Sequence, residues 1–332
     1  MTDMTRTKTR TATSRPGPGA PLRWLAIAAG IAALAVLPHV FTAAGHPYLL
    51  DALVRMIILA IAAVSLNFLV FTAGMVSFGH AVFFGIGAYA VGISDHYGIS
   101  SGFFHLAAAC AVSGLYALLT GMVVLRTRGI HFIMITLAFS QIVYYLMLGL
   151  EEYGGDDGLI IYGPSAFPLL DLGDKLTLYW VAIAILVAQI LFFMTLNRSR
   201  FGLVLSAAKG SERRVTSSGL HVRKYRLVAY VLSGMLTSLA GMLSANLTGF
   251  ITPQIMDWMR SGELLFVVTL GGMGTALAPL TGAALFVFLE EILSSLTVYW
   301  HFWFGIFLIV AVMFGGKRFM TMILSAFGRT PK

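Results

Sequence analysis

The chain has 332 residues, of which 58% are hydrophobic and only 11% are charged. Soluble globular domains usually carry about a quarter charged residues, so this composition excludes a chain whose surface faces only water. The formal net charge of +8 could suggest nucleic acid, but basic residues that flank apolar spans are better explained by membrane topology. We therefore expect no nucleic-acid partner. The single cysteine, Cys110, excludes an intramolecular disulfide and a thiolate metal cluster.

The N-terminal segment is rich in Thr, Arg, Pro and Gly and lacks the apolar content needed to fold. We expect residues 1–21 to form a disordered basic tail, residues 22–316 a transmembrane domain, and residues 317–332 a second tail. The first apolar run, Leu22–Phe41, could instead be a cleaved signal peptide, because Thr42-Ala43-Ala44 resembles a small-residue cleavage site. Its length and Arg23 at its edge favour a retained span.

Apolar runs long enough to cross a membrane recur along the chain. A transmembrane helix needs about 20 apolar residues to cross ~30 Å of hydrocarbon. Six runs are close to this length: Leu22–Phe41, Leu53–Phe71, Phe103–Leu125, Ile130–Leu150, Leu178–Leu196 and Leu227–Leu247. Four further segments are shorter or rich in glycine: Val76–Ser94, Gly262–Ala276, Leu280–Val298 and Phe302–Gly315. We predict an all-α polytopic membrane protein with about ten transmembrane or partly membrane-embedded helices.

The charged residues predict the topology. Of the 22 Lys and Arg residues, 19 fall in four clusters, at residues 6–23, 126–128, 198–226 and 317–332. Acidic residues concentrate instead in the loop over residues 151–177. Positively charged loops stay in the cytoplasm, so both termini and the segment 197–226 are predicted to be cytoplasmic. The loop 151–177 is then extracytoplasmic.

The segment from Leu66 to Tyr89 is too rich in glycine for an ordinary helix that faces lipid. Gly74 and Gly79 mark a break, and irregular backbone at membrane depth survives only where protein or a water-filled cavity covers it. We expect this segment to line either a translocation pathway or a close helix contact. The candidate residues are Asn67, Gly74, Met75, Ser77, Gly79 and His80.

A second glycine-rich interruption spans Leu270–Pro279. Its Gly271-Gly272-Met273 resembles Ala73-Gly74-Met75, and paired interruptions in two halves of a chain point toward a central pathway. The match is short, and the two segments do not occupy equivalent positions of a five-plus-five repeat, so it does not establish an internal repeat. Gly271, Gly272 and Gly274 join the candidates for the pathway or for helix packing.

The predicted cytoplasmic segment Asn197–Arg226 contains eight basic residues and one acidic residue, Glu212. Small and apolar positions between its charges favour a helix that docks into a partner's groove. A solvated basic loop held by anionic lipid is the alternative. The candidates for the docking surface are Gly202, Ala207, Glu212, Gly219 and Leu220.

Charged residues near the predicted outer ends form a further group of candidates. Asp51 and Arg55 have the i,i+4 spacing of an ion pair at a helix end. Together with Arg260 they could instead receive an extracytoplasmic binding protein through complementary charge. Glu290 lies late in an outward-running span and is retained because ionisable residues at membrane depth are functional by default.

The sequence gives little indication of a catalytic site. The sequence lacks the Gly-x-x-x-x-Gly-Lys-Ser/Thr loop that binds phosphate and the His-Glu-x-x-His pattern of zinc hydrolases. His80 and His131 have no second His or Cys at metal-ligand spacing. We predict a non-catalytic chain with no metal site and no cofactor of its own.

Four segments of the sequence occur in the order found in one known family. They are Asn67–Tyr89 with its core Ala73–Ala81, Arg128–Phe139, Gly154–Leu159 and Ser199–Ala276. In these segments the chain resembles the LivM-type permeases of branched-chain amino acid ABC importers, and four segments in order form a strong signal. Some positions depart from the family pattern, which leaves the solute and the choice of partner open: Met75, Arg213, Arg214, Val215, Ala278 and Gly315–Arg318.

The resemblance implies a complex in the bacterial cytoplasmic (inner) membrane. It would contain this multi-pass subunit, a second related permease, two cytoplasmic ATPases that bind ATP and Mg²⁺, and an extracytoplasmic solute-binding protein. Residues 199–220 would dock on an ATPase, and the chain would carry branched-chain or related small amino acids. An ion-coupled secondary transporter is the alternative, for which Glu263, Glu290 and Glu291 could serve as coupling sites.

Overall fold

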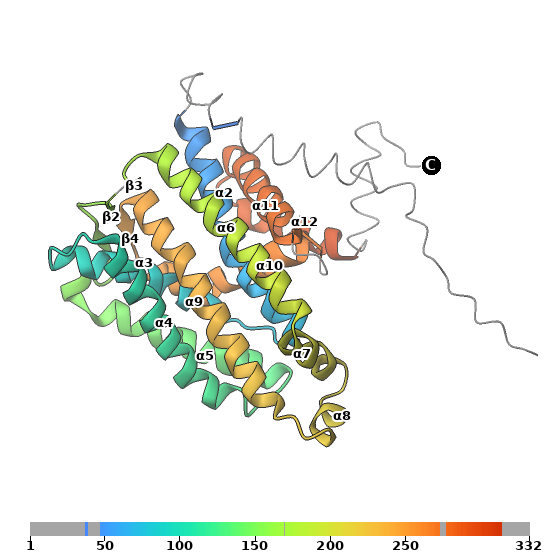
Figure 1. Cartoon of the computed structure of the whole chain (residues 1–332). Helices are drawn as coiled ribbons and strands as arrows, with labels where there is room; N and C mark the ends of the chain where they lie inside the picture. Colours follow the sequence, from blue (N-terminus) through green and yellow to red (C-terminus); the bar gives the residue numbers. More distant parts are fainter. Residues whose placement is uncertain (1–36, 39–46, 169, 273–276, 314–332) are drawn as a thin grey trace, which may run out of the picture. The chain divides into compact units, whose positions relative to one another are not determined.

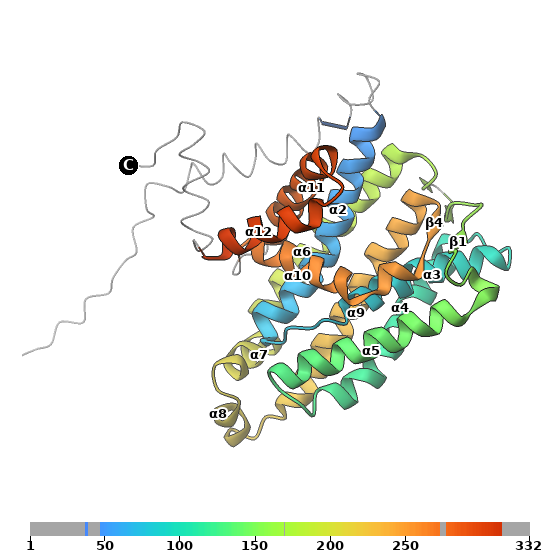
Figure 2. The same ribbon diagram turned by 180° about the vertical axis from the view of Figure 1, so that it is seen from behind.

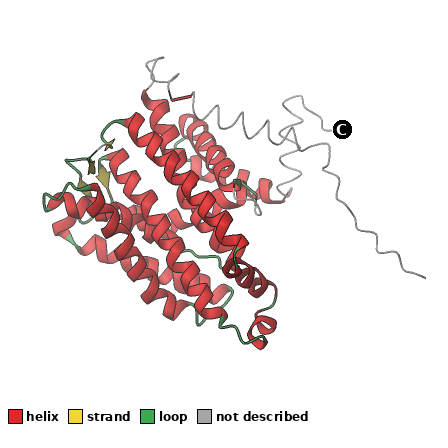
Figure 3. Ribbon diagram, viewed as in Figure 1, coloured by secondary structure: helices red, strands yellow, loops and turns green. Residues whose placement is uncertain are grey.

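The computed structural model describes residues 37–38, 47–168, 170–272 and 277–313. The chain divides into two compact units, residues 1–50 and 51–332, and nearly all of the described residues belong to the second. The described part of this second unit is almost entirely helical, with four strands of two residues each (Figure 3). Apart from Leu37 and Pro38, the predicted span Leu22–Phe41 lies outside the described residues, as do both predicted tails.

Every predicted span after the first overlaps a helix, although Val76–Ser94 begins before its helix and the ends of Gly262–Ala276 and Phe302–Gly315 lie outside the described residues (Figure 1). The long helices are α2 (Pro47–Asn67), continued by the π-helix η1 (Phe68–Ala73), α4 (Gly102–Val124), α5 (Ile130–Gly149), α6 (Lys175–Arg198), α9 (Val222–Thr248) and α11 (Ala278–Leu296). By length and composition, these six are apolar enough to cross a membrane. The shorter helices are α3 (His80–His96), α7 (Arg200–Gly210), α8 (Glu212–Ser217), α10 (Trp258–Leu270) and α12 (Trp300–Met313).

Helices α3, α4 and α9 form a tightly packed group, with α9 lying along both partners (Figure 1). A Cβ atom on Gly241 of α9 would lie 1.7 Å from the carbonyl oxygen of Phe84. On the facing helix, a Cβ atom on Gly87 would lie 1.8 Å from the carbonyl oxygen of Ser238. Only hydrogen fits at both positions, so the two backbones are in direct contact, as small residues permit in membrane helices.

Helices α10, α11 and α12 pack against one another (Figure 2). A Cβ atom on Gly282 of α11 would lie 2.0 Å from the carbonyl oxygen of Val267 of α10. Helix α10 has 13 residues and rises about 20 Å, which is less than the ~30 Å thickness of the hydrocarbon. It begins earlier than the predicted span Gly262–Ala276 and ends before the glycine-rich interruption.

The acidic loop after α5 is fastened to the end of α9 by short strands. Strand β1 (Leu159–Ile160) pairs antiparallel with β4 (Phe250–Ile251), and β2 (Ala166–Phe167) pairs with β3 (Leu170–Asp171). Two 3₁₀ turns flank these strands, η2 (Glu151–Tyr153) and η3 (Pro253–Met256). The loop therefore forms an ordered cap over one end of α9.

Helix α6 begins in this loop. The carboxylate of Asp174 accepts hydrogen bonds from the backbone N–H groups of Leu176 and Thr177, and the hydrogen bond from the Thr177 side chain lowers the pKa of Asp174. Because α6 starts at the acidic loop and ends at Arg198, the acidic loop and the basic segment lie at opposite ends of one long helix. The predicted topology depends on this separation of the acidic loop from the basic segment.

Candidate functional site

The predicted break is present between η1 and α3. Residues 74–79 form no helix, and Gly74 adopts a left-handed conformation with φ +69°. The carbonyl oxygen of Leu69 accepts hydrogen bonds from the N–H groups of Gly74 and Met75, which ends the π-helix in a compact turn. Glycine adopts this left-handed conformation at little energetic cost, whereas the backbone of a residue with a side chain would be strained there.

Side chains from other helices satisfy the interrupted backbone. The N–H of Phe78 donates to Thr136 Oγ1 of α5 at 3.1 Å. The N–H of Ala81 donates to Ser261 Oγ of α10 at 3.0 Å. Both hydroxyl residues are buried, and a buried backbone N–H without a partner would be costly. Neither Thr136 nor Ser261 was predicted as a site residue, although hydroxyl residues inside apolar helices are a known signal of contacts between helices.

His80, a predicted candidate, begins α3 and is fully buried. Its Nε2 lies 2.8 Å from Ser233 Oγ of α9, and the Ser233 hydroxyl donates to the carbonyl oxygen of Ser65 of α2. One histidine and one serine thus join three helices. His80 therefore takes part in the packing of these helices. Among the described residues, no group of three His, Cys, Asp or Glu side chains is suited to a metal ion.

The other candidates at the break lie on its buried side. Ser77 and Met75 are buried, and Ser77 Oγ accepts a hydrogen bond from the N–H of Gly79. A Cβ atom on Gly79 would lie 2.8 Å from the carbonyl oxygen of Thr136. Asn67 is buried at the end of α2, and its Oδ1 has no hydrogen-bond partner among the described residues.

Helix α7 makes direct contact with η1 on the other side of the break. Lys209 Nζ donates to the carbonyl oxygen of Phe71 at 2.8 Å and lies 4.7 Å from the centre of the Phe71 ring. Thr72 Oγ1 donates to Asn197 Oδ1, at the end of α6, at 2.9 Å. A cation at the last carbonyls of a helix satisfies them and opposes the negative end of the helix dipole. Neither Lys209 nor Asn197 was predicted as a site residue.

Glu212 lies at the start of α8 and holds two arginines. Its Oε1 accepts from Arg128 Nη2 and its Oε2 accepts from Arg226 Nη1, both at 2.7 Å. The only acidic residue of the basic segment therefore ties α8 to the loop before α5 and to α9. The Arg128 side chain is exposed, so its bond contributes only ~0–1 kcal/mol, whereas the Arg226–Glu212 pair is partly buried and fixes the orientation of α8 against α9.

Two of the four remaining residues predicted for partner docking line a groove between α7 and α8. Ala207 and Leu220 line this groove, which has a volume of about 380 Å³, together with Leu203, Val204 and Val215. Gly202 is buried in the first turn of α7, where a Cβ atom would lie 2.5 Å from the carbonyl oxygen of Leu196 at the end of α6. Gly219 follows α8 with φ +81° and reverses the chain toward α9.

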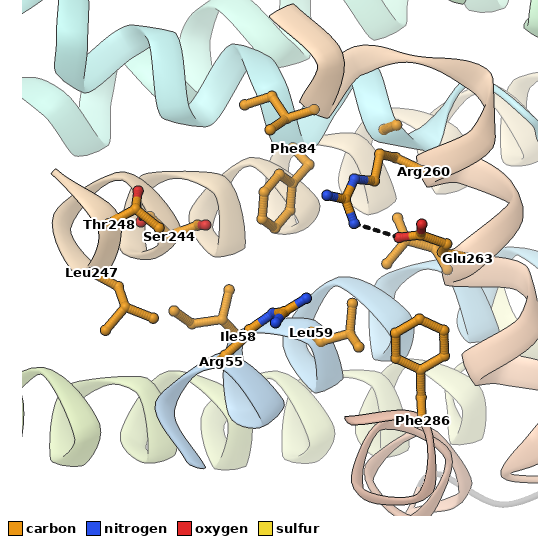
Figure 4. Close-up of a pocket in the computed structure, with 13 residues that line it drawn as sticks. Arg55, Ile58, Leu59, Phe84, Ser244, Leu247, Thr248, Arg260, Glu263 and Phe286 are labelled. Atoms are coloured by element: carbon orange, nitrogen blue, oxygen red, sulfur yellow. Dashed lines mark hydrogen bonds and ion pairs between the residues drawn. The ribbon is translucent and has the colours of Figure 1, made fainter. Parts of the chain in front are cut away.

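The charged residues predicted near the outer ends pair differently from the expectation. Asp51 and Arg55 do not pair with each other: Asp51 accepts from Lys175 Nζ at 2.7 Å, and Arg55 donates to Glu290 at 2.5 Å. Arg260 pairs with Glu263, one turn later in α10, at 2.7 Å. Arg55, Arg260 and Glu263 line a cavity of about 350 Å³ between α2, α3, α9, α10 and α11 (Figure 4).

Comparison with known proteins shows the family to which the chain belongs. Residues 48–315 match the family described as branched-chain amino acid transport system / permease component. The chain belongs to this family of permeases.

Two related permeases are described as high-affinity branched-chain amino acid transport system permease proteins LivM. Those of Salmonella typhimurium and Escherichia coli are each 29% identical to this chain, over 82% of the chain and 67% of their own length. The galactose/methyl galactoside import permease protein MglC of Haemophilus influenzae is 24% identical over 59% of the chain and 61% of its own length. No solved structure matches the chain significantly.

The second glycine-rich interruption of the permease is only partly described. Gly271 ends α10, and a Cβ atom there would lie 1.9 Å from the carbonyl oxygen of Ala278. Gly272 has φ +85°. Gly274 lies outside the described residues. Gly271 therefore sits at a close helix contact, which is one of its two predicted roles.

One serine motif of the permease matches a catalytic pattern by sequence alone. Gly98-Ile99-Ser100-Ser101-Gly102 fits the Gly-x-Ser-x-Gly pattern of serine hydrolases. That pattern requires a sharp turn from a strand into a helix, whereas here the residues join α3 to α4. The segment therefore lacks the geometry that exposes a nucleophile.

We predict that Gly79→Leu lowers the amount of folded permease in the membrane and abolishes transport. The new side chain would collide with the backbone of α5, and overpacking of this kind costs about 1–3 kcal/mol. Gly149→Leu is the matched control, because a Cβ atom on Gly149 at the far end of α5 has no neighbour within 4 Å. Membrane abundance and uptake of solute are measured together. Normal abundance and uptake in Gly79→Leu would contradict the close contact.

Proposed function

We propose that this permease is the non-catalytic, membrane-spanning subunit of an ATP-driven importer, and that it provides the pathway for branched-chain or related small amino acids. The observation that carries the proposal is the family match over residues 48–315, supported by the LivM relatives. The backbone break, which polar side chains cover, supports a pathway role. Irregular backbone at membrane depth is tolerated only where protein buries it or where it lines a water-filled cavity.

The proposed assembly contains a second related permease, two cytoplasmic ATPases and an extracytoplasmic solute-binding protein. ATP and Mg²⁺ would bind to the ATPases, and this chain would hold no cofactor or metal of its own. The complex would lie in the bacterial inner membrane. About ten transmembrane or partly embedded helices over residues 22–316 would place both termini and segment 197–226 in the cytoplasm, and loop 151–177 outside.

The segment over α7 and α8 is proposed to dock on an ATPase. Its groove is apolar, and its lining residues come from both short helices, as expected of a surface that accepts a partner's side chain. Lys209 and Asn197 contact η1 directly, so a displacement of α7 would reach the break without passing through a flexible linker. Glu212 would act from within the chain, by orienting α8 rather than by bonding the ATPase itself.

The alternative, an ion-coupled secondary transporter, is less well supported. A coupling carboxylate must exchange its ion during each cycle. Glu290 holds the Arg55 side chain instead. The family match also favours the ATP-driven importer.

We predict that the purified assembly in proteoliposomes accumulates leucine only when ATP and Mg²⁺ are supplied on the ATPase side and binding protein on the other. Radiolabelled leucine is measured inside the vesicles, and ATP replaced by a non-hydrolysable analogue is the control. Accumulation driven by a proton or sodium gradient without ATP would contradict the proposal and support the secondary transporter.

We predict that Glu212→Lys uncouples the permease from its ATPase, because a third cation would repel Arg128 and Arg226 and turn α8 away. Leucine-stimulated ATP hydrolysis by the purified complex should fall severalfold, and less ATPase should co-purify. Arg213→Gln, an exposed change on the same short helix, is the matched control.

A compensating change tests whether charge is the cause. Arg226→Glu combined with Glu212→Lys restores an opposite-charge pair at this place and should recover part of the stimulated hydrolysis. If Glu212→Lys alone keeps both co-purification and stimulation, α8 is not the coupling element, and the lipid-held basic loop becomes the better account.

A further inference from the structure

The cavity between α2 and α10 combines charges of both signs with an apolar wall. Its volume of about 350 Å³ falls at the small end of the ~300–1,000 Å³ that ligand pockets usually measure. Arg55 and Arg260 enter it from opposite sides, and Glu263 lies beside Arg260 (Figure 4). A cavity of this size suits one small solute.

The wall around these charges is apolar. It is built from α2, α3, α9, α10 and α11, which come from distant parts of the sequence. Burying an aliphatic side chain against such a wall is favourable because it removes apolar surface from water. The main apolar lining residues are Ile58, Leu59, Phe84, Leu247, Leu264 and Phe286.

The two arginines are exceptional in this sequence. Of the 22 Lys and Arg residues, only Arg55, Lys175 and Arg260 lie outside the four basic clusters, and two of these three line the cavity. Arg55 is the ninth residue of α2, about 12 Å along the helix from its first residue at 1.5 Å per residue. Arg55 also falls inside the apolar stretch Tyr48–Ala73, and ionisable residues within membrane-spanning helices are functional by default.

Arg55 retains donors that its own ion pair does not use. A guanidinium has five N–H donors, and the bond from Nη2 to Glu290 Oε1 uses one of them. Glu290 holds it through that single oxygen, since Oε2 is buried with no hydrogen-bond partner among the described residues. The Arg55 side chain is 51% exposed, so the rest of its planar fork is accessible to a second carboxylate.

We propose that this cavity binds the solute as a zwitterion, with its carboxylate at Arg55, its ammonium group at Glu263 and its aliphatic side chain against the apolar wall. This assignment rests on the proposed function, which supplies the small amino acid. The four charges of Arg55, Arg260, Glu263 and Glu290 sum to zero. A zwitterion therefore enters without leaving a net charge in the site, whereas a monocarboxylate or an amine would leave one.

Binding to the purified permease–ATPase complex without the binding protein tests this assignment, because the selectivity of the binding protein is then absent. Radiolabelled leucine should bind saturably. Unlabelled leucine should displace it, and the concentration that halves the bound radioactivity sets the reference. At ten times this concentration, neither 4-methylpentanoate, which lacks the ammonium group, nor 3-methylbutylamine, which lacks the carboxylate, should displace the bound leucine.

Substitutions at the cavity give the second part of the test. Arg55→Gln should weaken leucine binding at least about tenfold, and Arg55→Lys should weaken it less, because lysine keeps the charge but lacks the fork. Lys175→Gln is the matched control: it breaks the ion pair with Asp51, one turn before Arg55 on α2, and Lys175 does not line the cavity. If Arg55→Gln fails to assemble, Glu263→Gln, which removes the negative charge assigned to the ammonium group, should weaken leucine binding by the same measurement.

The outcomes separate this assignment from the proposed function. An unchanged leucine affinity in Arg55→Gln, or displacement by either analogue as effective as by leucine, would overturn it. A wild-type complex that imports leucine with ATP but shows no saturable binding would also overturn it, while leaving the proposed function in place. A complex that imports no amino acid overturns both.

Discussion

An interrupted backbone inside a membrane must find hydrogen-bond partners within the protein, because lipid offers none. The break over residues 74–79 imposes this requirement on the whole described bundle. Thr136 of α5, Ser261 of α10 and the His80–Ser233 contact to α9 meet it from three sides. These bonds fix the position of each of these helices along α3. The glycine contact between α3 and α9 brings the two backbones close enough for the His80–Ser233 contact to form.

The same break is contacted from two sides. On its buried side it is held by α5, α9 and α10, and on its exposed side η1 is held by Lys209 and Asn197 at the junction of α6 and α7. Helix α7 therefore contacts η1, which leads directly into the break. Glu212 ties the following helix, α8, to α9, so the basic segment bridges both sides of the break. A partner that moves this segment would act on η1 and α9 together.

The sequence predicted the helices after the first span and the break itself with good accuracy, because long apolar runs and paired glycines are local signals. Val76–Ser94 was predicted as a helix from its first residue, but α3 starts only at His80, since the extended break occupies the intervening residues. Tertiary partners could not be predicted in this way. The i,i+4 rule paired Arg55 with Asp51, whereas Glu290, 235 residues away, takes that bond in the structure.

The hydroxyl residues around the break illustrate the same limit. Serine and threonine in apolar helices often bond a carbonyl of their own helix, and Thr136 does so with Ile133 while it also accepts from Phe78. From the sequence, these two roles cannot be told apart. The role of Lys209 was hidden for a related reason, since a lysine in a basic segment is expected in solvent and not at the end of a π-helix.

The central claim is that motion at α7 reaches the break through Lys209. It is tested most directly by a distance across the break, measured by electron spin resonance between labels at Val70 of η1 and Ile86 of α3 in the assembled complex, with Cys110 replaced by alanine. The distance should change when ATP binds to an ATPase unable to hydrolyse it, and Lys209→Met should suppress the change. A distance that is the same with and without ATP, or a change that survives Lys209→Met, would contradict the claim.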